Sequence, residues 1–83
     1  MSTVLKKLLD KMDRAVDDSD RAMMNINDVA ESMAAARARG DHGREATLQQ
    51  ELEDARRAKA NAAARVTATA QEITVEVARD QQA

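Results

Sequence analysis

Arg39-Gly40-Asp41-His42-Gly43-Arg44 contains both glycines of this 83-residue chain, which has no proline. Glycine and proline are the strongest helix breakers, so the breakers of this chain are confined to one place near its midpoint. A stretch of similar length without breakers lies on each side. We therefore expect an all-α fold, a long antiparallel helical hairpin forming a single domain over residues 1–83. The expected elements are a helix over about residues 3–39, a turn over 40–43 and a helix over about 44–79.

Apolar residues of the first arm repeat with heptad spacing. One column reads Leu5, Met12, Ser19, Ile26 and Met33, and a second reads Leu8, Ala15, Ala22, Val29 and Ala36. Two such columns form the seam of a coiled coil. A third apolar column lies beside them and consists of Leu9, Val16, Met23 and Ala30. Because three columns suit a helix with more than one neighbour, we predict that the third column is an oligomer interface. The hairpin would then associate into a homodimeric four-helix bundle or a larger helical assembly.

The second arm carries one apolar stripe with steps close to 3.6 residues, the spacing of a nearly straight helix. It reads Leu48, Leu52, Ala55, Ala58, Ala62, Val66, Ala70, Ile73 and Val77. Its later part alternates like a strand and is rich in β-branched residues, but a single strand has no partner in this chain, so we expect helix there too.

The two arms complement each other in size if they pack antiparallel. Facing residues then have numbers that add to roughly 83, with large side chains opposite small ones. This register places Ala34 and Ala30 opposite Leu48 and Leu52, and Ile26 and Met23 opposite Ala58 and Ala62.

Composition argues against most kinds of chemistry. The chain has no cysteine, no aromatic residue and one histidine, so we expect no disulfide, no metal or cofactor site and no enzymatic activity. A net charge of −2 gives no general attraction to nucleic acid or to an anionic membrane. No apolar run approaches the ~20 residues of a membrane span, and the stretch from Met1 to Asp10 lacks the apolar core of a cleavable signal peptide. The expectation is a soluble protein, in the cytoplasm or within a larger assembly.

The turn region gathers positive charge. Arg37, Arg39, His42 and Arg44 form a candidate recognition tip, because cations at the end of a helical hairpin can contact phosphate or RNA. Two features weigh against nucleic acid: carboxylates such as Glu45 are interleaved, and without aromatic residues there is no platform on which bases can stack.

The segment Asp41-His42-Gly43-Arg44-Glu45-Ala46-Thr47-Leu48 resembles the element that opens the second helix of the helical chorismate mutases. The first arm has Leu8 and Leu9 where that family has an early arginine, and no turn divides the second arm into two helices. No catalytic residue is carried across. The hairpin is also similar in architecture, without a shared motif, to the plasmid copy-control RNA-binding hairpins, which dimerise into four-helix bundles.

The function that these observations favour is a non-catalytic, oligomerising helical-hairpin interaction module, a small structural or assembly component. Its expected partners are itself and another protein. The alternative is a small nucleic-acid-binding regulator that uses the arginine-rich tip, and a chorismate-mutase-like enzyme stands third.

Overall fold

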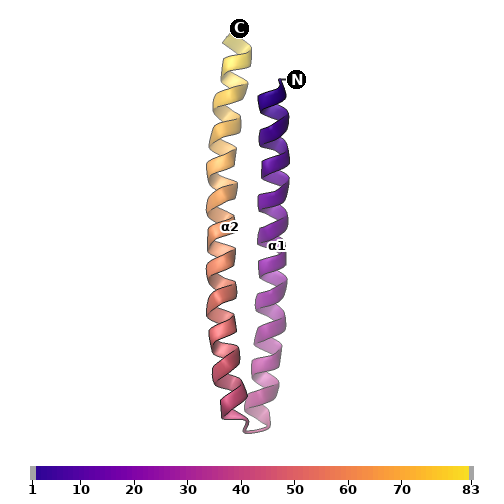
Figure 1. The fold of residues 1–83 in the computed structure, drawn as a ribbon, viewed down its shortest axis with the longest axis vertical. Helices are drawn as coiled ribbons and strands as arrows, with labels where there is room; N and C mark the ends of the chain where they lie inside the picture. The colour runs from indigo at the N-terminus through magenta and orange to yellow at the C-terminus, as the bar shows by residue number, and fades with distance from the viewer. Residues whose placement is uncertain (1, 83) are drawn as a thin grey trace.

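The computed structural model describes residues 2–82, and both elements in that range are helices. α1 spans Thr3–Ala38 and α2 spans His42–Gln82. The two helices run antiparallel as an extended hairpin (Figure 1), whose Cα atoms span 65 × 14 × 12 Å. The predicted all-α hairpin is therefore confirmed.

The turn closes with hydrogen bonds that satisfy the free backbone groups at the helix ends. The N–H of Asp41 donates to the carbonyl of Ala36 at 2.9 Å, and the N–H of Gly40 donates to that of Arg37 at 3.0 Å. This is the Schellman arrangement, which requires a left-handed residue just past the helix, and Gly40 has a φ of 72°. Asp41 then caps α2, because its Oδ1 accepts from the N–H of Arg44 at 3.0 Å.

Local chemistry also explains the start of α1 and the late part of α2. Ser2 caps α1, since its Oγ accepts from the N–H of Leu5 at 3.0 Å. The β-branched segment 66–77 is helical throughout, and α2 continues past it to Gln82. Within this segment the Thr74 hydroxyl donates to the carbonyl of Ala70 at 2.9 Å, which satisfies the hydroxyl inside the helix.

The seam of α1 agrees with the two predicted heptad columns. The buried residues of α1 all belong to the second column and are Ala15, Ala22, Val29 and Ala36. The column that begins at Leu5 is half-buried along its whole length. The small residues of the second column therefore form the deepest line of contact with α2.

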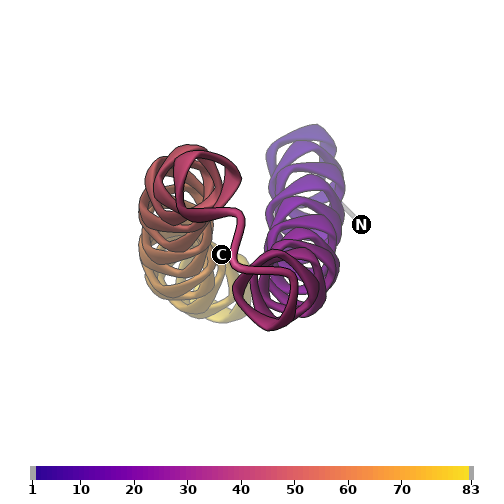
Figure 2. The ribbon, with the colours of Figure 1, turned by 90° about the horizontal axis from the view of Figure 1, so that it is seen from below.

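The seam of α2 also has heptad spacing, so the predicted stripe of 3.6-residue steps is wrong at three positions. The predicted seam residues that are exposed are Ala58, Ala70 and Val77, and the residues that occupy the seam in their place are Lys59, Thr69 and Glu76. Around a straight helix the line of a seven-residue repeat drifts by about 20° per heptad, so two long helices keep such lines in contact along their length only by supercoiling. Figure 2 shows α1 and α2 winding around each other.

Two ion pairs between the helices show their register. Lys11 Nζ lies 3.2 Å from Glu72 Oε1, and Arg65 Nη1 lies 3.1 Å from Asp18 Oδ2. In both pairs the residue numbers add to 83, so the predicted register is confirmed. These side chains are about half exposed, and such pairs contribute at most about 1 kcal/mol each.

The predicted facing residues are wrong even though the register is right. Ala30 and Ala34 are exposed, and the core cluster instead joins Leu48 and Leu52 to Val29 and Ala36, with Ile26 and Met33 packed against it. Ala58, predicted to lie opposite Ile26, instead lines a shallow groove with Asn25. The prediction failed because it paired residues by number alone and so placed Met23, Ala30 and Ala34 in the seam, although they lie outside the two buried columns of α1.

Candidate functional site

The two long sides of the hairpin differ in polarity. One side carries both ion pairs between the helices, and we call the residues Lys11, Asp18, Arg65 and Glu72 the charged side. These residues occupy equivalent heptad positions on one flank of the seam. On each helix of an antiparallel coiled coil, the residue directly after a deeply buried seam residue lies on the flank opposite the charged side.

That other flank is apolar on both helices. On α1 it carries the predicted interface column, Leu9, Val16, Met23 and Ala30, and on α2 it carries Ala63, Ala70 and Val77, which we together call the apolar face. All seven residues are exposed, and Leu9, Val16, Met23 and Val77 retain 37–42% of their surface. The hairpin by itself therefore leaves the predicted interface column uncovered.

Sequence reasoning missed the contribution of α2 to this face. It placed Ala70 and Val77 in the seam, because a straight-helix stripe passes through them. A heptad count from Leu48 through Ala55 and Ala62 assigns both residues to the flank. Applying the heptad repeat of α1 to α2 would therefore have identified Ala70 and Val77 as residues of this face.

The turn brings the four residues of the candidate recognition tip to one end of the hairpin. Arg37 is engaged there, since its Nε donates to Glu45 Oε2 at 2.9 Å. Arg39, His42 and Arg44 are exposed. The structure leaves three side chains free to meet a ligand at the tip and neutralises the charge of the fourth.

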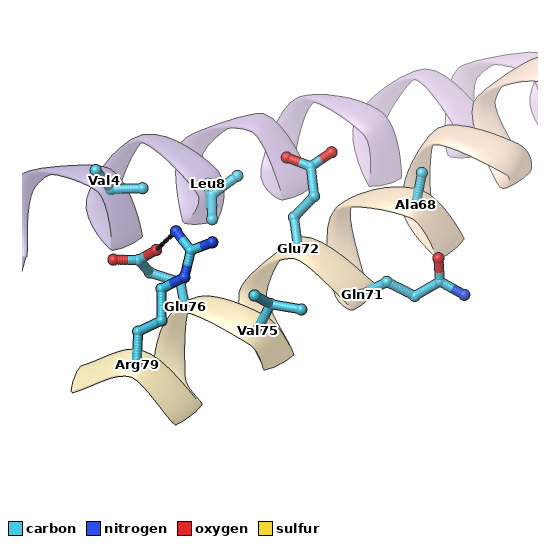
Figure 3. Close-up of a pocket in the computed structure, with 8 residues that line it drawn as sticks. All are labelled: Val4, Leu8, Ala68, Gln71, Glu72, Val75, Glu76 and Arg79. Atoms are coloured by element: carbon cyan, nitrogen blue, oxygen red, sulfur yellow. Dashed lines mark ion pairs between the residues drawn. The ribbon is translucent and has the colours of Figure 1, made fainter. Parts of the chain in front are cut away.

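The open end of the hairpin carries a groove on the charged side (Figure 3). It is lined by Val4, Leu8, Ala68, Gln71, Glu72, Val75, Glu76 and Arg79. Glu76 occupies the seam with its side chain mostly covered, and its Oε2 lies 3.8 Å from Arg79 Nη1. The groove therefore pairs apolar walls from both helices with an internal ion pair.

Residues 2–82 contain neither a metal-ligand cluster nor a membrane-spanning helix. No group of three histidine, cysteine, aspartate or glutamate side chains there is placed to hold a metal ion. No helix in the same range has the length and apolar character needed to cross a membrane. Comparison of the chain with protein family models, curated proteins and solved structures finds no match.

Proposed function

We propose that the chain is a non-catalytic helical-hairpin interaction module that oligomerises through its apolar face and serves as a small structural or assembly component. The observation that carries the proposal is the row of Leu9, Val16 and Met23, which the fold leaves 38–42% exposed at heptad spacing. Complete burial of such a side chain stabilises by ~1.5–3 kcal/mol. A partner that covers the remaining surface gains about 1 kcal/mol from each residue.

The continuity of the face supports the same function. Single exposed apolar residues are ordinary on protein surfaces, whereas a contiguous apolar strip marks an interaction site. Here Val16 and Met23 lie on α1 beside Ala63 and Ala70 on the same flank of α2, and no charged residue separates them within the face. The small alanines leave room for side chains of a partner.

Adjacent methionines allow a matched test. Met23 lies on the apolar face, whereas Met24 points away from α2 and is 65% exposed. We expect sedimentation velocity between ~1 and ~100 µM, a range in which modest dimers form, to show a dimer or higher oligomer. Met23→Lys shifts it to monomer, while Met24→Lys leaves it unchanged, with helicity followed by circular dichroism. A parent chain that stays a folded monomer at the highest concentration contradicts the proposal.

The same purified proteins also test the alternative function, a nucleic-acid-binding regulator. That alternative uses Arg39, His42 and Arg44, the three tip residues other than the Arg37 that pairs with Glu45. Fluorescence anisotropy with an RNA hairpin and a DNA duplex detects binding, and a steep loss of affinity with salt marks phosphate contacts. If binding is salt-sensitive and disappears in an Arg39→Ala/Arg44→Ala variant, the regulator is the correct function and the interaction module is not. Indifference to both nucleic acids supports the module.

A further inference from the structure

We propose that the apolar face binds a second copy of this chain side by side, with both turns at the same end, so that α1 of each copy packs on α2 of the other. The inference rests on the proposed function and adds the occupant of the face and its orientation. It depends on how apolar and charged residues are distributed along the hairpin.

The first observation is that the face changes character along its length. The apolar residues of the face run from Leu9 to Ala30 on α1 and from Ala63 to Val77 on α2, while the equivalent positions nearest the turn are Arg37 on α1 and Gln49 and Arg56 on α2, all exposed. In two fully overlapping copies with turns at opposite ends, α2 would pack antiparallel on α2, with Ala70 of one copy against Arg56 of the other and Val77 against Gln49. Turns at the same end keep apolar residues against apolar residues.

The second observation is the charge along the edges of the face. Asp13 and Asp20 flank it on α1, and Thr67 and Thr74 occupy the corresponding edge of α2. If the turns lay at opposite ends and the copies slid until their apolar halves overlapped, α1 would pack on α1. Asp13 and Asp20 of one copy would then meet Asp20 and Asp13 of the other, and such like-charge contacts are unfavourable.

Turns at the same end remove this repulsion. A two-fold axis parallel to the hairpin places α1 of one copy opposite α2 of the other at equal height. The acidic edge of α1 then faces neutral threonine hydroxyls. Within the face Val16 lies nearest Ala70 and Met23 nearest Ala63, so at these two levels a large side chain meets a small one, and Leu9 lies nearest the apolar Val77.

One whole side of the hairpin is large enough for a dimer interface only if the copies align lengthwise. The Cα atoms of the hairpin span 65 × 14 Å in its two longer dimensions. The product is about 900 Å², close to the ~800 Å² that each partner buries in a standard interface. Copies that crossed at a steep angle would bury a small fraction of this area.

The absence of cysteine from the sequence allows two single-site spin labels to test the arrangement. Ala38→Cys places a nitroxide at the turn end of α1 and Met24→Cys places one near its middle, both at exposed positions facing away from α2. We measure distances between copies at ~100 µM by double electron–electron resonance. With helix diameters of ~10–12 Å, turns at the same end give about 30–40 Å for both labels.

The outcomes separate this inference from the proposed function. Turns at opposite ends still give a short distance for the Met24→Cys label but move the Ala38→Cys labels beyond about 50 Å, given ~1.5 Å of rise per residue. That result overturns the arrangement and leaves self-association standing. No distance for either label, with monomers in sedimentation, overturns both.

Discussion

Replacement of Ala62 by leucine tests whether the helices approach closely along their small-residue columns. Ala62 is 1% exposed, and in the observed register it lies level with the buried Ala22 of α1. Leucine adds three carbon atoms where neither helix offers a gap. Overpacking of this kind costs about 1–3 kcal/mol. For a domain of this size each 1 kcal/mol lowers the Tm by about 4–8 °C, so we expect a decrease between about 4 and 24 °C.

The assay is thermal unfolding followed by circular dichroism. Protein concentration is held fixed, because self-association makes the Tm depend on it. Ala64→Leu is the matched control, since it adds the same atoms two residues away on the exposed outer surface of α2. If the Tm of Ala62→Leu equals or exceeds that of the control, the helices do not approach closely at this level and the reasoning is refuted.

Two further substitutions test the seam and the turn. Thr69 is fully buried and its Oγ1 has no hydrogen-bond partner, so Thr69→Val should stabilise the fold by about 1 kcal/mol and raise the urea midpoint. Thr74→Val, at an exposed position, is the control and should leave the midpoint nearly unchanged. A lower midpoint for Thr69→Val contradicts the prediction. Gly40→Ala should cost about 1–2 kcal/mol in the same titration, because an L-residue is strained at a φ of 72°. Gly43→Ala should not destabilise, since its added Cβ meets nothing closer than 3.9 Å, and equal midpoints for the two alanine variants would remove the role assigned to Gly40.

The sequence alone determined the features that depend on local chemistry and on a regular repeat. The position of the turn follows from two glycines in a chain without proline, and Gly40 takes the left-handed conformation expected just past a helix. The contact line of α1 follows from two heptad columns that only Ser19 interrupts. The register follows from the position of the turn, because a tight hairpin leaves little freedom to slide.

Only the tertiary structure decided which side of α2 meets α1. Alanine is so frequent in α2 that several of its faces are apolar, and Ala58, Ala62 and Ala63 each offer a plausible contact from sequence alone. The regular heptad line of α1 selects among them, since the helices must supercoil to stay in contact along their length. That choice draws Lys59, Thr69 and Glu76 into the seam.

The same choice determined the composition of the candidate interaction surface. The exposed column of Leu9, Val16 and Met23 was readable from the repeat of α1, whereas Ala70 and Val77 join it only because the supercoil moves them from the seam to the flank. Hydrophobic periodicity identifies an apolar stripe, but the partner helix determines which part of the stripe is buried. In a helix rich in small residues, the buried side is therefore determined only when the two helices pack together.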